Sequence, residues 1–324
     1  MLVAAALPGP LSLKFAEDGT AGNDSDHCRC HNAQMRTSLR IAGFLLAFVG
    51  AATAADDAHH SLWVVKGKSN SVVLLGSVHM LKPDASELPA EALQAYEHAV
   101  ALVMEVDLGS VTSEGMVSAM SALGALPEEQ TLASVLGPEL YGRFKTQAAS
   151  EGLDAELLEH MQPWMAALML DQAQMARLGF VGAAGVDQQL AQRAATDHKR
   201  IVGLETIDEQ LGMFAQLSAD QQRHFMRYTL DEQGHTAEQL GTIVTAWRTG
   251  NTRALEKLLG EGFEDFPDLY RVLTTDRNRK WLTTVVPLLN GTEDYLVIVG
   301  AMHLVGKGGL VALLRDRGFT VVQH

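Results

Sequence analysis

Short apolar runs and turns alternate at the start of the hydrophobic pattern. Residues 61–65 and 71–75 flank the turn sequence Gly67-Lys68-Ser69-Asn70 and predict a β-hairpin. A helical stretch follows over residues 88–98. Residues 100–106 then form an almost unbroken apolar run, which is typical of a buried strand.

Helical periodicity dominates the middle of the chain. From about residue 112 to 180, Met, Leu and Ala recur every three and four positions, and helices are also expected over most of 206–289. Between these blocks, residues 187–197 predict a helix and residues 201–204 a short strand. This pattern indicates a large helical insertion.

The pattern ends with a strand at 295–299, a glycine-rich turn, a helix at 310–317 and a strand at 320–322. A hairpin at one end and a strand–helix–strand unit at the other predict an α/β (α+β) fold with a mixed central sheet flanked by helices. No Pro/Ser-rich linker divides the chain after residue 60, so we expect a single domain over residues 55–324.

A different apolar segment lies upstream. Arg36 and Arg40 precede an apolar run of about a dozen residues, too short to cross the roughly 30 Å hydrocarbon core as a helix. The run ends in the small-residue pattern Ala52-Thr53-Ala54. Residues 35–54 therefore read as a signal peptide of a periplasmic or secreted protein, with a buried helix as the alternative.

Residues 1–34 precede this signal and carry no periodic apolar pattern, so we expect an over-extended, disordered start with Met35 as the true first residue. Cys28 and Cys30 lie in this stretch with metal-like spacing to two histidines. Residues 55–324 contain no cysteine, which suits an oxidising compartment without disulfides. We expect no integral membrane segment within residues 55–324.

Composition narrows the functional classes. The chain has 324 residues, of which 47% are hydrophobic and 20% charged, which excludes a wholly disordered or fibrous protein. Lys and Arg number 25 against 39 Asp and Glu, and the net charge is −14. An acidic chain without basic runs is a poor nucleic-acid binder, because that affinity comes mainly from phosphate neutralisation.

One arrangement occurs twice. A buried strand runs into Gly76-Ser77-Val78-His79, and another into Gly300-Ala301-Met302-His303. Each glycine allows a sharp turn and a close approach at the strand end. Two imidazoles delivered to one sheet edge can bind a divalent metal. The helical blocks between the two motifs should form a lid or groove over that edge.

Five further residues are candidates for the same site. Glu105 lies at the end of the apolar run at 100–106, where an unpaired carboxylate is costly. We therefore expect it to bind a metal, to cap the following helix or to pair with an arginine. Glu205 is either a further site carboxylate or a helix N-cap, and Asp187 either a site residue or a cap. Arg277-Asn278 could bind substrate through a fork of donors or lie on a solvated helix face.

These pieces resemble the TraB/GumN family, which includes the Tiki membrane metalloproteases. The resemblance covers about residues 61–324. The motifs that carry it, in the family's order, are Gly76-Ser77-Val78-His79, Leu88-Pro89, Met104-Glu105-Val106-Asp107, Gln162-Pro163-Trp164, Gly185-Val186-Asp187, Gly203-Leu204-Glu205-Thr206, Arg277-Asn278 and Gly300-Ala301-Met302-His303.

The resemblance implies a fold similar to the erythromycin esterases and the haem-binding ChaN-like proteins. It also implies a site made of the two Gly-x-x-His motifs and a glutamate, and a dependence on manganese or cobalt like that of the family's proteases. The chain departs from Tiki in showing no C-terminal membrane anchor, so we expect a soluble or loosely attached periplasmic protein.

Three functions follow as hypotheses. The first is a metal-dependent hydrolase, a peptidase above all, in which His79 and His303 hold Mn, Co or Zn. Glu105 would be a third ligand or the general base for a metal-bound water, and Glu205 a fourth ligand. Arg277 and Asn278 would then orient a peptide or small-molecule substrate. The second is a metal-free esterase in which a histidine activates water. The third is a non-catalytic binder of haem or peptide.

The signal-peptide interpretation makes a direct prediction. The exported protein should begin at Ala55, because signal peptidase cleaves after a small-x-small pattern. N-terminal sequencing of the protein from a periplasmic extract measures this. A cytoplasmic product, or one that keeps the apolar segment, would contradict it.

Overall fold

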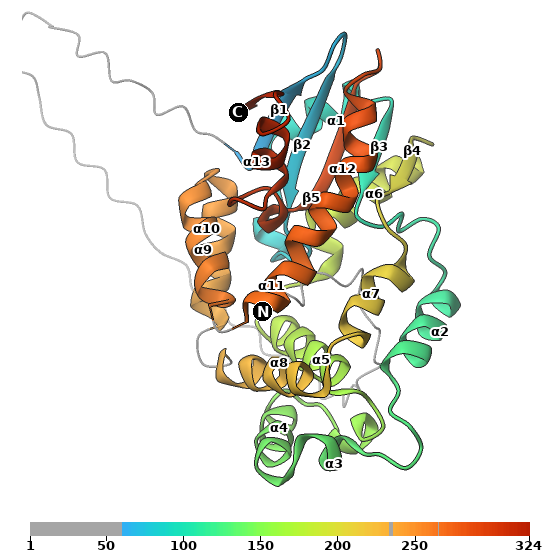
Figure 1. The fold of residues 1–324 in the computed structure, drawn as a ribbon, viewed down its shortest axis with the longest axis vertical. Coiled ribbons are helices and arrows are strands. Elements are labelled where there is room, and N and C mark those ends of the chain that lie inside the picture. The colour runs from blue at the N-terminus through green and yellow to red at the C-terminus, as the bar shows by residue number, and fades with distance from the viewer. Residues whose placement is uncertain (1–59, 233–235, 265) are drawn as a thin grey trace, which may run out of the picture. The chain divides into compact units, whose positions relative to one another are not determined.

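The computed structural model describes residues 60–232, 236–264 and 266–324 (Figure 1). The expected early start, the signal peptide, and Cys28 and Cys30 lie outside the described residues. In the part of the chain that is described, no helix combines the length and the apolar character needed to span a bilayer.

A six-stranded mixed sheet forms the centre, in the order β4-β3-β5-β2-β1-β6. The strands are β1 (Leu62–Lys66), β2 (Ser71–Ser77), β3 (Ala101–Met104), β4 (Arg200–Gly203), β5 (Tyr295–Gly300) and β6 (Thr320–Gln323). The first four strands in the order are mutually parallel, and β1 is antiparallel to both β2 and β6. The predicted α/β fold with a mixed sheet is confirmed.

Helices make up most of the remaining chain. They are α1 (Ala90–His98), α2 (Ser113–Gly124), α3 (Leu132–Leu136), α4 (Pro138–Ser150), α5 (Pro163–Arg177), α6 (Val186–Thr196), α7 (Ile207–Ala215), α8 (Ala219–Glu232), α9 (Thr236–Arg248), α10 (Thr252–Gly262), α11 (Pro267–Tyr270), α12 (Asp276–Leu288) and α13 (Leu310–Arg315). The predicted hairpin forms with Leu62 opposite Leu75.

The helices fall into three groups around the sheet. In Figure 1, α12 and α13 lie in front of the sheet, and α1 and α6 lie behind it. Right-handed crossovers produce this division, because the connections from β2 to β4 and those from β4 to β6 run in opposite directions across the sheet. The third group, which includes α5, α7 and α8, lies below the sheet (Figure 1).

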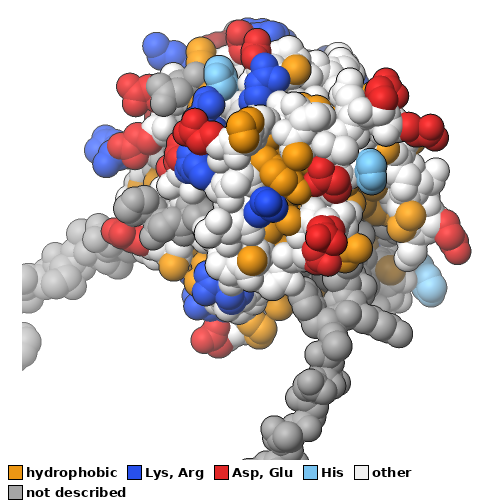
Figure 2. Space-filling model, turned by 90° about the horizontal axis from the view of Figure 1, so that it is seen from below, with side chains coloured by type: hydrophobic (Ala, Val, Ile, Leu, Met, Phe, Trp, Pro, Cys, Tyr) orange, Lys and Arg blue, Asp and Glu red, His pale blue; other side chains and the backbone are white. Residues whose placement is uncertain are grey.

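Figure 2 views the molecule from the side of this third group. Basic and acidic side chains are interspersed there with hydrophobic ones, so the described residues form no broad basic area on that face. Leu157 and Val117 are among the exposed apolar side chains of the chain, at 72% and 56% exposure. Apolar side chains that are exposed singly are normal for a soluble protein surface.

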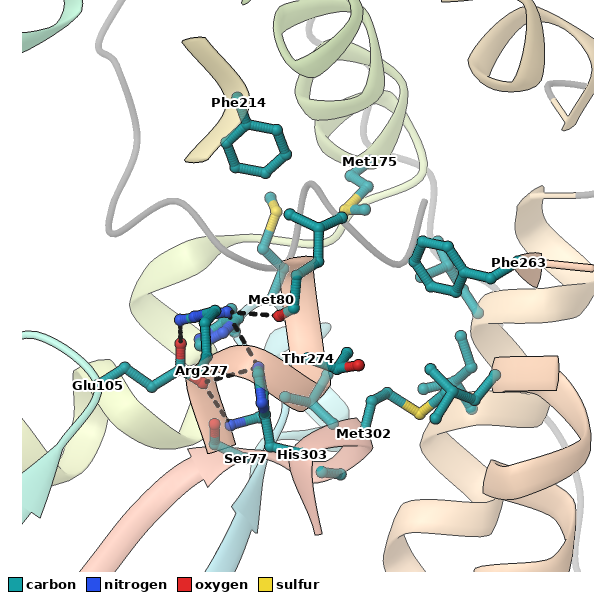
Figure 3. A pocket seen from close by; sticks show the side chains of 18 residues that line it. Ser77, Met80, Glu105, Met175, Phe214, Phe263, Thr274, Arg277, Met302 and His303 are labelled. Atoms are coloured by element: carbon teal, nitrogen blue, oxygen red, sulfur yellow. Dashed lines mark hydrogen bonds and ion pairs between the residues drawn. The ribbon is translucent and has the colours of Figure 1, made fainter. Parts of the chain in front are cut away.

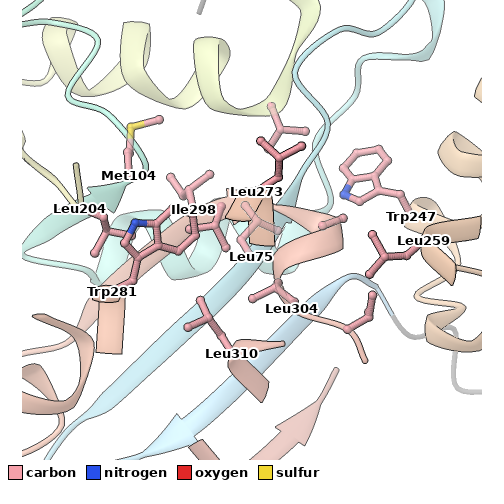
Figure 4. Close-up of a cluster of buried hydrophobic side chains, with 14 of the residues drawn as sticks. Leu75, Met104, Leu204, Trp247, Leu259, Leu273, Trp281, Ile298, Leu304 and Leu310 are labelled. Atoms are coloured by element: carbon pink, nitrogen blue, oxygen red, sulfur yellow. The ribbon is translucent and has the colours of Figure 1, made fainter. Parts of the chain in front are cut away.

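The core joins the sheet to α12 and α13. Leu75 and Ile298 of the sheet pack with Trp281 of α12 and Leu310 of α13, and all four are essentially buried (Figure 4). Burying each side chain of this size contributes about 1.5–3 kcal/mol. This packing fixes α12 against the strands, and α12 carries one of the site residues described below.

Gly185 allows one close approach near the sheet. A Cβ at this position would lie only 2.1 Å from the carbonyl oxygen of His79, so no other residue fits without a backbone shift. The next residue, Val186, donates its N–H to the carbonyl of Val78 at 3.0 Å. The start of α6 is therefore held against the segment that follows β2, which brings Asp187 beside His79.

Candidate active site

The carboxyl ends of the four parallel strands deliver one polar residue each to the same edge of the sheet. Their ends are aligned, because Ser77 lies opposite Gly300 and Met104 opposite both Ile298 and Gly203. The crossovers change face among these strands, and such a switch point is where open α/β sheets bind ligands. The residues delivered there are Glu205 after β4, Glu105 after β3, His303 after β5 and His79 after β2.

Arg277 lies at the centre of these residues. It stands in the first turn of α12, directly after the π-helical turn Arg271–Thr275, and is 6% exposed. Its Nη2 donates to Glu105 Oε2 at 2.6 Å and to Glu205 Oε1 at 2.5 Å. Its Nε donates to Glu205 Oε2 at 3.2 Å. The rigid guanidinium fork thus ties two buried carboxylates to one cation.

His303 is held by Asn278 on one side and Arg277 on the other. Asn278 Nδ2 donates to the carbonyls of His303 and Gly308 at 3.1 and 2.8 Å. Its Oδ1, 2.7 Å from His303 Nδ1, must therefore accept a hydrogen bond from the ring N–H. His303 Nε2 is then the acceptor for Arg277 Nη1 at 3.0 Å. Burial and the positive charge of Arg277 lower the pKa of His303 to about 3.

His79 is paired differently. Its Nδ1 lies 2.8 Å from Asp187 Oδ1, and both side chains are largely buried. Burial favours the neutral ring, but the carboxylates of Asp187 and Glu105 outweigh it and raise the pKa of His79 to about 9. Asp187 caps no helix, because the N-cap of α6 is Gly185. His79 therefore carries a proton at neutral pH.

Glu105 is held by donors on several sides (Figure 3). Besides Arg277, the N–H of Gly300 donates to its Oε1 at 2.7 Å, and Gln210 Nε2 donates to its Oε2 at 3.2 Å. Burial alone would raise the pKa of Glu105, but Arg277, His79 and the Gly300 N–H lower it to about 2. Glu105 is thus an ionised carboxylate with Arg277 as its partner, one of the alternatives that the sequence left open.

Glu205 shares Arg277 with Glu105, but its pKa is shifted in the opposite direction. Burial raises the pKa of Glu205 more than Arg277 lowers it. Trp281 Nε1 donates to its Oε2 at 3.2 Å, and the Trp281 ring also lies under the guanidinium, 4.7 Å from Arg277 Cζ. The N-cap of α7 is Thr206, so Glu205 belongs to the charged cluster and does not cap the helix.

A mainly apolar pocket opens above these polar groups (Figure 3). Its floor includes His79, Glu105, Arg277 and His303. Its apolar walls come from α5, α7, α9, α10 and the segments beside them: Met80, Met175, Phe214, Leu240, Ile243, Leu259, Phe263, Leu273 and Met302. The helical blocks that follow the first Gly-x-x-His motif therefore do cover the sheet edge that carries the two histidines.

The expected metal ligands converge without forming a metal site as they stand. His303 Nε2 lies 4.0 Å from Glu105 Oε1. Within residues 60–232, 236–264 and 266–324, however, no group of three His, Cys, Asp or Glu side chains is arranged to hold an ion. Arg277 lies among these groups: its guanidinium supplies a positive charge there and contacts Nε2 of His303 and Oε2 of Glu105.

Arg277 and Asn278, which the sequence analysis grouped as one donor pair, have different positions in the structure. Arg277 lines the pocket, whereas Asn278 is only 1% exposed. The polar atoms of Asn278 bind His303 and Gly308, so Asn278 supports the site and does not reach substrate. Sequence reasoning missed Gln210, which donates to Glu105 and to Glu205. No motif marks Gln210, and the only available signal was its position on the helix that follows Glu205.

Comparison with known proteins places the chain in a family. The profile of the TraB/PrgY/gumN family matches residues 61–323, so the chain belongs to this family. No solved structure gives a significant match.

Relatives of known sequence agree with this placement. The uncharacterized protein YbaP of Escherichia coli (strain K12) is 29% identical over 75% of this chain and 87% of its own length. Metalloprotease TIKI1 of Danio rerio is 24% identical over 83% of this chain and 64% of its own length. The metalloprotease TIKI homolog of Nematostella vectensis is 22% identical over 80% of this chain and 66% of its own length.

The buried ion cluster predicts a large stability effect. Arg277→Met should lower the free energy of unfolding by about 3–5 kcal/mol, because it leaves two carboxylates buried without their cation. Urea denaturation followed by circular dichroism measures the change. Arg279→Met is the matched control on the same helix, where an exposed pair with Asp276 predicts a loss below about 1 kcal/mol. Equal losses in the two variants would contradict the role of the cluster.

The His79–Asp187 pair predicts a shifted titration. His79 should titrate near pH 9 in NMR spectra, and the pKa should fall in Asp187→Asn, because the carboxylate that offsets burial is then gone. The raised pKa also means that the charge of His79 stabilises the fold fully below about pH 6.5 and that this contribution is lost as the pH rises through 9. His303, neutral above pH 3, is the internal reference. An unchanged His79 titration in Asp187→Asn would refute this explanation.

Proposed function

We propose that this protein is a hydrolase that cleaves a peptide or ester bond beside a large apolar group of its substrate. The observation that carries the proposal is the position of His79 and Glu105 together on the polar floor of an apolar pocket. Relatives that are named metalloproteases support hydrolysis as the class of reaction. We also propose, from the pattern at residues 35–54, that it acts in the periplasm or after secretion.

The protonation states suit an acid and a base. With a pKa of about 9, His79 holds a proton at neutral pH, while Glu105, with a pKa of about 2, holds none. Enzymes commonly push the pKa values of two neighbouring groups apart in this way to separate the two roles. A low pKa is compatible with the role of base, since aspartic proteases use a carboxylate dyad whose lower pKa is about 1.5.

In the proposed reaction, the oxygen of a water molecule bonds to the substrate carbonyl carbon while one of its protons passes to Glu105. The carbonyl electron pair moves to the carbonyl oxygen, and the positive charge of the nearby Arg277 guanidinium, whose N–H groups are already paired, stabilises the negative charge there. The electron pair on that oxygen then re-forms the carbonyl, the bond to the leaving nitrogen or oxygen breaks with its electron pair on the leaving atom, and the proton of His79 passes to that atom. The proton on Glu105 returns to His79 through solvent, which restores the site.

The pocket walls define the kind of substrate. Methionine, phenylalanine and leucine side chains make up most of its apolar walls, so the group seated there should be large and apolar. Met80, Met175 and Met302 adapt to different shapes, because methionine is unbranched and flexible. We therefore propose a preference for apolar side chains or acyl groups without strict selection among them.

A divalent ion offers another route to the same class of reaction. Manganese, cobalt or zinc on His79, His303 and Glu105 would require Arg277 to leave His303 Nε2, where it lies at 3.0 Å. The proposal above uses only the side chains as they are arranged. Metal dependence is therefore a separate arm of the test.

Hydrolysis is tested with purified protein and a set of fluorogenic N-acyl peptides and esters that vary in the residue beside the scissile bond. Apolar substrates should be cleaved, and Glu105→Gln and His79→Asn should each reduce kcat by roughly 10²–10⁴-fold, the usual contribution of acid–base groups. Each assay is run after chelator dialysis and again with Mn²⁺, Co²⁺ or Zn²⁺.

The exposed residues His98 and Glu128 supply matched controls, His98→Asn and Glu128→Gln, which should keep full activity. Loss of activity on chelation, with recovery on adding an ion, would replace the metal-free route by a metal-dependent one. The proposed function fails if no substrate is cleaved under any condition. Haem or peptide binding without turnover would then favour a non-catalytic binder.

A further inference from the structure

A second, smaller cavity lies against the same catalytic side chains. It measures about 30 Å³, and Ser77, His79 and Glu105 line both this cavity and the larger apolar pocket. Its other polar walls are Asp187 and Gln210. The small cavity is therefore separated from the substrate pocket only by residues of the site itself.

Two buried polar atoms at this cavity have neither a hydrogen-bond partner nor an ion-pair partner within the described part of the chain. One is the hydroxyl of Ser77, which is 3% exposed at the end of β2. The other is Oε1 of Gln210, which is 2% exposed on α7. A buried polar atom without a partner destabilises the folded protein, so each of these atoms calls for an explanation.

The orientation of the Gln210 amide is fixed by its neighbours. Its Nε2 donates to Glu105 Oε2 at 3.2 Å and to Glu205 Oε1 at 3.1 Å, and only the nitrogen end of the amide can serve two carboxylates. The oxygen end is therefore an acceptor with no protein donor. The Ser77 hydroxyl can donate or accept, so the two atoms together offer one acceptor and one adaptable partner.

We propose that the small cavity holds the water molecule that attacks the substrate, with Ser77 and Gln210 as its positioning residues; this inference rests on the proposed hydrolysis. A buried water needs about 10–15 Å³ and two to four polar partners, and the cavity has room for one or two waters. The water donates one hydrogen to Gln210 Oε1 and accepts from Ser77 Oγ. Its other hydrogen faces Glu105, which takes that proton when the oxygen bonds to the carbonyl carbon.

A crystal structure of the protein at high resolution and a kinetic comparison test this inference. We expect an ordered water within hydrogen-bond distance of Ser77 Oγ and Gln210 Oε1. Ser77→Ala should lower kcat roughly tenfold to a hundredfold, the cost of a misplaced reactant, with KM unchanged. Its melting temperature should not fall, because the hydroxyl that it removes has no protein partner.

Ser61→Ala is the matched control. Ser61 is a buried serine beside β2 that lines neither cavity and donates to the carbonyl of Trp247 at 2.9 Å. This variant should keep kcat and lose stability, the reverse of Ser77→Ala. A Ser77→Ala enzyme with unchanged kcat would overturn the inference, and so would a covalent acyl adduct on Ser77 detected by mass spectrometry, which would make Ser77 the nucleophile.

The crystallographic arm separates this inference from the proposed function. If the wild-type protein hydrolyses its substrates but the cavity contains no ordered water, the inference fails while the hydrolase assignment stands. If the water is present but the wild-type protein cleaves nothing, the hydrolase assignment fails and the water site loses its catalytic role.

Discussion

The site depends on one buried cation, the guanidinium of Arg277. Glu105 and Glu205 would repel each other at the ends of neighbouring strands without it, and it also occupies Nε2 of His303. A buried charge of this kind is tolerated only when nearly all of its donors are paired, and here Nε, Nη1 and Nη2 all have partners. The packing of Trp281 and the register of the sheet together place this cation, so the electrostatics of the site are a consequence of the core.

Sequence patterns predicted most of the fold, because each of its strands is a short apolar run bounded by turn residues. Residues 100–106 and 295–299 gave β3 and β5 to within a few positions. The two Gly-x-x-His repeats indicated a shared sheet edge, because their glycines and histidines have the same spacing after a strand. Strand order was not predictable in this way, since it depends on how the distant segments pair.

The partners of the site residues were harder to predict than the residues themselves. Arg277 was expected to meet substrate or solvent, yet it binds Glu105 and Glu205, which are 172 and 72 positions away. Gln210 lies in no motif, and Ser77 lies between the glycine and the histidine of the first Gly-x-x-His motif; the importance of both arises from burial and from atoms left without partners. Local spacing does not encode such relations, because they arise from tertiary packing.

The position of β1 has a consequence for how the chain folds. It lies between β2 and β6, and the N–H of His324 donates to the carbonyl of Leu62 across 262 positions, so the first and last described strands close the sheet together. Contacts this distant in sequence form slowly. Until β6 pairs with it, one edge of β1 has unpaired backbone N–H and C=O groups that can pair with a strand of another chain. During synthesis, the open edge of β1 therefore remains available for wrong strand pairing until residues 320–323 have been made.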